Sequence, residues 1–240
     1  MAHAKPVYRR VLLKLSGEAL TTADHGFGIE PKVLDRCAAD VAALRELGVQ
    51  VAVVVGGGNF YRGAALTEAG LERVTGDQIA MLATVMNALA VSDIFNKVGI
   101  PSRVLSAFAI SGVVEAHKPQ QACRYMDNGE TIIFAAGIGN PYFTTDSAAS
   151  LRGIEIKADV VLKATKVDGV YSADPVKDKN ATLYSELSYQ EIIEKQLKVM
   201  DLTAVCLCQD NNMPLHVFNM NKSGALLNIV TGKPEGTIIR

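Results

Sequence analysis

Residues 159–175 read DVVLKATKVDGVYSADP, a segment in which an apolar strand breaks into a polar turn. Val160, Val161 and Leu162 have the side chains of a buried strand, and the Asp-Gly and Asp-Pro pairs that follow are turn signals. The lysines, acids and tyrosine of the segment are therefore expected at the carboxyl end of a strand. Because ligands of open α/β sheets bind outside the carboxyl ends of strands, the segment predicts a fold class and a binding site together.

The remainder of the chain alternates between strand-like and helix-like patterns. Strands are predicted at residues 7–15, 49–55, 103–105, 131–135, 215–218 and 237–239. Helices are predicted at residues 31–47, 76–98, 119–128, 189–195 and 202–211, from a cap at Thr144 or Thr145 to residue 156, and after a cap at Ser223. This alternation predicts an α/β fold with a mostly parallel central sheet between helix layers, forming one domain over residues 1–240.

Composition narrows the classes of partner. The chain has 240 residues and is 49% hydrophobic, which is enough for one sizeable core. Its 24 basic and 25 acidic residues give a net charge of -1 without a basic block, which disfavours nucleic acid as a partner. No run approaches the roughly 18 apolar residues of a membrane helix, and the four cysteines lack the paired spacing of a zinc site. We therefore expect a soluble, cytoplasmic protein with no membrane partner.

Lys14 interrupts the apolar run VLLKLSG, which ends in Gly17. A charge in such a run is unfavourable unless it faces a cavity, where a lysine can reach a phosphoryl oxygen. Glycine allows the backbone to turn close to a ligand. The structural alternative is a solvated lysine at a strand edge.

The sequence GGGN at residues 56–59, followed by Arg62, comes directly after another predicted buried strand. Consecutive glycines expose backbone N–H groups that can bind an anion, and an arginine offers a bidentate contact to phosphate. A simple tight turn is the alternative, although a turn needs only one glycine. The segment is not a P-loop, because GxxxxGK[ST] does not occur in the chain.

A third glycine-bearing strand end reads GIGNPYFTTD at residues 137–146. Hydroxyl groups and free amides at the start of a helix can bind an anion or a base edge. Asp146 can hold a metal ion or position a lysine. The structural alternative is a helix cap. The loop can cap the helix and also bind a ligand.

These three stretches, together with LKATKVDGVYSADP at residues 162–175 and FNMN at 218–221, resemble the amino acid kinase superfamily and, within it, the bacterial uridylate kinases. The resemblance extends from about residue 8 to residue 237. It implies phosphoryl transfer from ATP to UMP, giving UDP and ADP, in pyrimidine nucleotide biosynthesis. It further implies Mg²⁺ carried by ATP, a homohexamer and inhibition by UTP. Members activated by GTP carry basic or histidine side chains where this chain has Ser92 and Asn96, so GTP activation is left open.

The resemblance also assigns residues to each substrate. Its ATP-binding residues are Lys14, Leu15, Ser16, Gly17, Gly58, Arg62, Thr165, Tyr171 and Asp174. Its UMP-binding residues are Gly57, Asp77, Ile138, Gly139, Asn140, Pro141, Tyr142, Phe143, Thr144 and Thr145.

Phosphoryl transfer needs mainly positioning and charge stabilisation, because the group in transfer is anionic. Lys14, Arg62 and Lys163 are therefore expected to supply positive charge. Asp146, and as a second candidate Asp201, would orient lysines or magnesium. No set of protein side chains is predicted to form a metal site without ATP.

Two other functions fit parts of the pattern. A superfamily kinase acting on a carboxylate or carbamate would share Lys14 and the glycine loops, but would have no use for Asp77 with the GNPYFTTD loop. A non-catalytic nucleotide-binding or storage protein of the same fold is the second alternative. The presence of Lys14, Arg62, Asp146 and Asp174 together argues against it.

Overall fold

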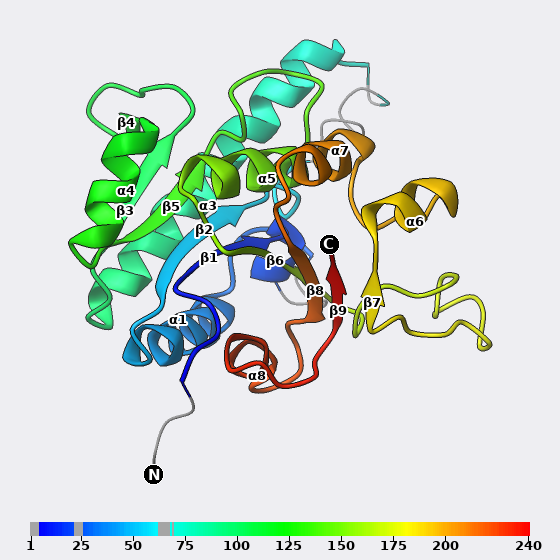
Figure 1. The fold of residues 1–240 in the computed structure, drawn as a ribbon. Coiled ribbons are helices and arrows are strands. Elements are labelled where there is room, and N and C mark those ends of the chain that lie inside the picture. Colours follow the sequence, from blue (N-terminus) through cyan, green and yellow to red (C-terminus); the bar gives the residue numbers. More distant parts are fainter. Residues whose placement is uncertain (1–4, 22–25, 62–67, 69) are drawn as a thin grey trace.

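The computed structural model describes residues 5–21, 26–61, 68 and 70–240. Within this part of the chain, a nine-stranded sheet has the order β4-β3-β5-β2-β1-β6-β8-β9-β7 (Figure 1). The strands are β1 (Arg10–Leu15), β2 (Gln50–Val55), β3 (Ser102–Ser106), β4 (Glu115–Ala116), β5 (Thr131–Ala135), β6 (Val160–Thr165), β7 (Glu186–Leu187), β8 (Leu215–Asn219) and β9 (Thr237–Ile239). The helices are η1 (Gly17–Leu20), α1 (Pro31–Glu46), α3 (Arg73–Lys97), α4 (Pro119–Asp127), α5 (Thr145–Glu155), α6 (Tyr189–Glu194), α7 (Leu202–Asp210) and α8 (Ala225–Val230).

Neighbouring strands of the sheet are parallel except for β8 and β9. β1 lies at the centre, paired with β2 on one side and with β6 on the other. Strands that are buried on both faces carry nearly continuous apolar runs, as β1, β2 and β6 do. The predicted fold class, a mostly parallel sheet between helix layers, is confirmed.

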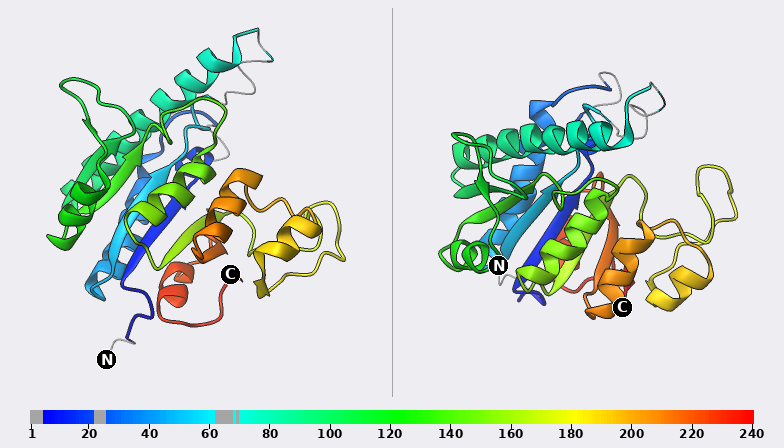
Figure 2. Two further views of the ribbon diagram at one scale, coloured as in Figure 1. Left: turned by 45° about the horizontal axis from the view of Figure 1, so that its top comes forward. Right: turned by 90° about the horizontal axis from the view of Figure 1, so that it is seen from above.

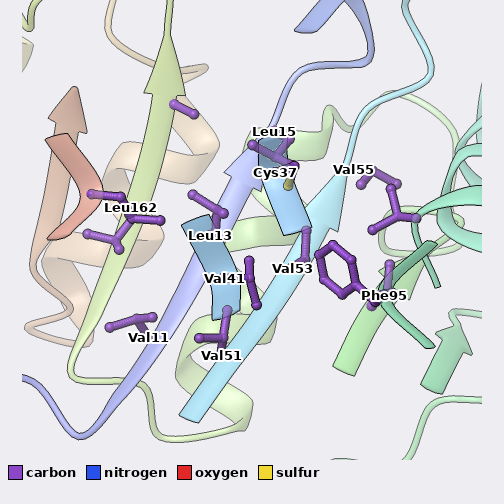
Figure 3. Packing of buried hydrophobic residues seen from close by; sticks show 14 of the residues in the cluster. Val11, Leu13, Leu15, Cys37, Val41, Val51, Val53, Val55, Phe95 and Leu162 are labelled. Carbon is purple, nitrogen blue, oxygen red and sulfur yellow. The ribbon is translucent and has the colours of Figure 1, made fainter. Parts of the chain in front are cut away.

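Alternate residues of β1 face different helix layers. Val11, Leu13 and Leu15 pack with apolar residues of α1, α3 and α8 (Figure 3). Leu12 packs with residues of α4, α5, α6 and α7 instead. The two further views in Figure 2 show the sheet between these layers. Because side chains alternate along a strand, Lys14 lies on the same face as Leu12, toward α5.

Some predicted boundaries were wrong. The first strand begins at Arg10 rather than at residue 7, and the long helix predicted from residue 76 begins at Arg73. The residue that caps α8 is Gly224 rather than Ser223, because the backbone there has φ 76°, which glycine adopts without a steric penalty. β4 and β7 were not predicted, since strands of two residues carry no detectable periodicity.

Among the described helices, α3 is long and apolar enough to cross a membrane by length and composition. However, 44% of its most apolar stretch is buried inside the fold. The helix also contacts β2, β3 and β5. Part of its apolar character is therefore that of a helix that packs on a sheet, and the rest is exposed.

Gly153 of α5 provides a test of this packing. A Cβ atom at this position would lie 2.6 Å from Cγ2 of Val161 on β6. Alanine is favoured over glycine inside a helix by about 1 kcal/mol, but overpacking a core costs about 1–3 kcal/mol. We expect Gly153→Ala to lower the free energy of unfolding, measured by urea denaturation.

The matched control places Gly153→Ala in a Val161→Ala background, where the opposing methyl groups are absent. The two substitutions should then be less destabilising together than the sum of their separate effects. A stability gain from Gly153→Ala alone would contradict the predicted close contact.

Candidate active site

The carboxyl ends of β1 and β2 approach each other closely through glycine. A Cβ atom on Gly17 would lie 2.4 Å from the backbone nitrogen of Gly58, and one on Gly57 would lie 2.8 Å from the carbonyl oxygen of Ala80 in α3. The Gly56 N–H donates to the carbonyl of Leu15 at 2.9 Å. The glycine-bearing ends of the first two strands therefore meet, and the close backbone contacts account for much of the glycine requirement.

The last residue of the GGGN segment has a structural role. Asn59 is buried, and its side chain exchanges two hydrogen bonds with the buried side chain of Asn87 from α3, at 3.0 and 2.7 Å. Asn87 also donates to the carbonyl of Gly56 at 2.7 Å. Sequence reasoning missed Asn87, whose only signal is its position as a polar residue in an alanine- and methionine-rich helix.

A buried charge cluster joins β1, β6 and α5. Lys14 and Lys163 are paired positions on neighbouring strands, so their side chains emerge side by side. Asp146, in the first turn of α5, lies 2.8 Å from Nζ of Lys14 and 2.7 Å from Nζ of Lys163. The three side chains are only 9–14% exposed. These three side chains carry one net positive charge, and the carboxylate of Asp201 also acts on Lys163.

The environment shifts the pKa values of this cluster. Burial alone would raise the pKa of Asp146, but the charges of Lys14 and Lys163 outweigh it, and the pKa falls below its usual 3.8. Burial lowers the pKa of Lys163, and the attraction of Asp146 only partly offsets that effect. A phosphate bound beside Lys163 would favour its charged form.

Asp201 lies next to this cluster, but its hydrogen bonds serve the two helices. Its carboxylate accepts from the backbone N–H of Ala204, capping α7 at 2.9 Å, and from Ser147 Oγ at 3.0 Å. The hydroxyl of Thr144, which is the N-cap of α5 and one of the two predicted caps, also donates to Asp201. Among the described residues, no group of three or more His, Cys, Asp and Glu side chains is arranged to hold a metal ion.

The loop after β5 approaches the start of α3. One oxygen of Asp77 accepts from the backbone N–H of Tyr142 at 2.8 Å and from Nε of Arg73 at 2.8 Å. The guanidinium of Arg73 lies 5.6 Å from the centre of the Tyr142 ring. The structure thus brings Asp77 together with the GNPYFTTD loop, two parts of the chain that sequence reasoning assigned to one substrate.

Two adjacent cavities open near the ends of the same strands. Thr165, Tyr171 and Asp174 all line one cavity of about 560 Å³. Asp146 and Lys163 line the second, of about 780 Å³. Both cavities are bordered by the segment between α6 and α7, residues 196–199. The three side chains predicted on the ATP side therefore share one cavity close to the lysine cluster, whereas Arg62 lies outside the described residues.

Known proteins resemble this chain along most of its length. A family model described as "Amino acid kinase family" matches residues 9–219. A uridylate kinase of Saccharophagus degradans is 61% identical, with 97% of this chain and 94% of that protein covered. A uridylate kinase of Pseudomonas aeruginosa is 60% identical, with 98% and 96% covered. The solved structure of the UMP kinase from Bacillus anthracis has a TM-score of 0.94 at 36% identity, with 97% of this chain and 96% of that chain covered.

The charge cluster predicts a stability effect that depends on pH. Asp146→Asn should lower the free energy of unfolding at pH 7 by about 3 kcal/mol, because it leaves two buried lysines without their partner. The pKa of Asp146 is lower in the folded state than its usual 3.8. Its contribution to the free energy of unfolding is therefore complete above pH 3.8 and is lost as the pH falls through the folded-state pKa. Urea denaturation of both proteins should therefore show a difference that narrows below pH 3.8.

Asp93→Asn is the matched control, because Asp93 forms an exposed ion pair with Lys97 in α3. Its loss should lower the free energy of unfolding by at most about 0.5 kcal/mol. Equal losses for the two variants at pH 7 would show that Asp146 makes no special contribution.

Proposed function

The chain belongs to the amino acid kinase family, and from that premise we propose that it is an ATP-dependent kinase that transfers the γ-phosphoryl group of ATP to UMP. The observation that carries this proposal is the Lys14–Asp146–Lys163 cluster, which lies beside the cavity lined by Thr165 and Tyr171. Relatives about 60% identical over nearly the whole chain bear the name uridylate kinase. The products are UDP and ADP, which places the reaction in pyrimidine nucleotide biosynthesis.

The cluster suits a transfer that proceeds without covalent or general-base catalysis. The attacking group is a phosphate oxygen that is already ionised, so no base is needed. The negative charge on the phosphoryl group during transfer requires positioned cations. Lys14 and Lys163 provide these, and Asp146 fixes both ammonium groups. We propose that Arg62 adds a third positive charge at the transferring group.

We assign the two substrates to opposite sides of the cluster. ATP would place its nucleoside in the cavity lined by Thr165, Tyr171 and Asp174, with its phosphates over the backbone of Leu15, Ser16, Gly17 and Gly58. UMP would lie along Gly57, Asp77 and the loop formed by Ile138, Gly139, Asn140, Pro141, Tyr142, Phe143, Thr144 and Thr145. The hydrogen bond between Asp77 and the backbone of Tyr142 supports a common acceptor site. A carboxylate or carbamate kinase does not account for that pairing, and the presence of Lys14, Asp146 and Asp174 argues against a storage protein.

We propose that Mg²⁺ enters as a complex with ATP. Both oxygens of Asp146 lie within 2.8 Å of a lysine Nζ, so this carboxylate is already compensated by protein charges. A nucleotide phosphate supplies the oxygen ligands that magnesium prefers. Asp201 is only the second candidate for contact with the metal. Its oxygens already accept hydrogen bonds from α5 and α7, and these bonds compete with a metal ion.

Self-association is supported by an exposed apolar face of α3. Leu82, Met86 and Leu89 are spaced along one side of this helix and are exposed. Such a face is typical of a contact between subunits, and we propose the homohexamer implied by the family. We further propose a cytoplasmic protein consisting of one domain over residues 1–240, which the family match to residues 9–219 supports.

Inhibition by UTP has more support than activation by GTP. UTP shares its uracil and ribose with UMP, so we propose that it competes for the acceptor site. The GTP question rests on Ser92 and Asn96, which form a neutral hydrogen-bond network with Ser102. Arg103 pairs with Glu130. These contacts offer no cation for a phosphate, but Arg124 of α4 is exposed, and GTP activation is left open.

One assay tests the function. The protein is incubated with ATP, Mg²⁺ and, separately, UMP, CMP, glutamate, acetylglutamate or carbamate, and ADP release is followed. We expect ADP release with UMP and loss of that activity when EDTA exceeds Mg²⁺. Release with an amino acid or carbamate instead would favour a carboxylate or carbamate kinase, and nucleotide binding without turnover would favour the storage protein.

Paired variants test the two sides of the site. Asp77→Asn should raise KM for UMP about tenfold, because a hydrogen bond to a charged group is lost, and should leave KM for ATP unchanged. Tyr171→Ala should raise KM for ATP and leave KM for UMP unchanged. Steady-state kinetics with each substrate varied in turn measure both constants, and exchanged effects would reverse the assignment of the two sides.

A further inference from the structure

The loop after β5 begins with two residues in the left-handed backbone region, a conformation that is unfavourable for Ala136 and accessible to Gly137. Ala136 has φ 58° and Gly137 has φ 57°, and Ala136 is completely buried. The turn is closed by a hydrogen bond of 2.9 Å from the N–H of Gly139 to the carbonyl of Ala136. A residue other than glycine keeps a left-handed conformation only where surrounding contacts hold it.

Contacts from two helices on opposite sides of the sheet hold this turn. The N–H of Ala136 donates to Oγ1 of Thr84, from α3, at 2.7 Å. The carbonyl of Gly137 accepts from Nη2 of Arg152, from α5, at 3.3 Å. The backbone groups of two successive residues are therefore fixed by buried side chains.

Arg152 is itself held by a half-buried relay. Its Nη1 donates to Oε2 of Glu155 at 2.7 Å, and the same oxygen lies 2.8 Å from Nε2 of His117. The side chain of His117 is 3% exposed, and its ring packs edge-on against Phe134 at 5.0 Å between centres. The relay thus links the segment after β4, the end of α5 and the loop after β5.

The protonation states in the relay follow from its charges. Burial would raise the pKa of Glu155, but hydrogen bonds from His117 and Arg152 outweigh burial and lower it. An ionised carboxylate only accepts hydrogen bonds, so the proton between the two side chains belongs to Nε2 of His117. Nδ1 of His117 is buried and has no hydrogen-bond partner among the described residues. The ring is therefore held through Nε2 and its packing.

We propose that His117, Glu155 and Arg152 are positioning residues that set the affinity for the acceptor nucleotide by fixing the first turn of its loop. This proposal rests on the proposed function, in which the loop binds UMP. None of the three side chains belongs to the lysine cluster. Without the relay, the carbonyl of Gly137 loses a fixed donor, and a smaller fraction of molecules has a loop competent to bind.

Glu155→Gln tests the relay directly, because it keeps the shape of the side chain and removes its charge. We expect KM for UMP to rise about tenfold, since a charge-assisted contact is lost and the competent loop is less populated. KM for ATP and kcat should stay within about twofold, because the lysine cluster is untouched. In hydrogen exchange, the amide of Gly139 should exchange faster than in the unchanged protein, because the turn closed by its hydrogen bond to Ala136 loses the contact at the carbonyl of Gly137.

Variants of His117 separate positioning from general packing. His117→Gln keeps an N–H donor near the position of Nε2 and should retain most of the affinity for UMP, whereas His117→Leu should raise KM for UMP as Glu155→Gln does. Ser150→Ala is the matched control, because Ser150 is buried in the same helix and donates to the carbonyl of Ala204 on the side of α7. It should leave KM for UMP unchanged.

The outcomes distinguish this proposal from the function on which it rests. If the unchanged protein does not phosphorylate UMP, the proposed function fails. If it does, and Glu155→Gln leaves KM for UMP unchanged, the relay has no positioning role. An equal rise in KM for both substrates, or the same rise in Ser150→Ala, would show a general structural effect and would also overturn the proposal.

Discussion

The contact of Asp146 with Lys14 and Lys163 is the interaction on which the active end of the sheet depends. The two lysines occupy paired positions on adjacent strands, so without a counter-charge they would repel each other in a buried environment. The carboxylate comes from the first turn of α5, where the helix dipole also favours negative charge. One helix start thus supplies the counter-charge that a buried pair of cations requires.

Around this cluster, features that stabilise the fold also shape the site. Gly17 and Gly57 are needed because backbone atoms approach too closely for a side chain, and the same positions belong to the proposed ATP and UMP sites, respectively. Thr144 caps α5 and meets Asp201, which in turn caps α7. The site is therefore assembled from helix starts and strand ends whose local geometry the fold already requires.

The features that could be predicted are those encoded by residues close together in the sequence. The buried strand and turn of residues 159–175, the three glycine-bearing strand ends and the cap at Thr144 all follow from neighbouring residues and were found correctly. Asn87 and Arg152 were missed, because each is a polar residue inside a helix whose partner lies at a distant place in the chain. Periodicity shows that such residues interrupt an apolar pattern, but not what they contact.

The sequence by itself determined the alternation of strands and helices, the family and the chemical character of each strand end, because these depend on residue type and spacing over short stretches. The tertiary structure decided which charged side chains form ion pairs and which loops contact each other. Lys14 and Lys163 face α5 rather than α1 because of strand register and the alternation of side chains across the sheet. The left-handed turn at Ala136 exists because helices from both layers hold it, and no local pattern encodes contacts between residues that meet only after the sheet has formed.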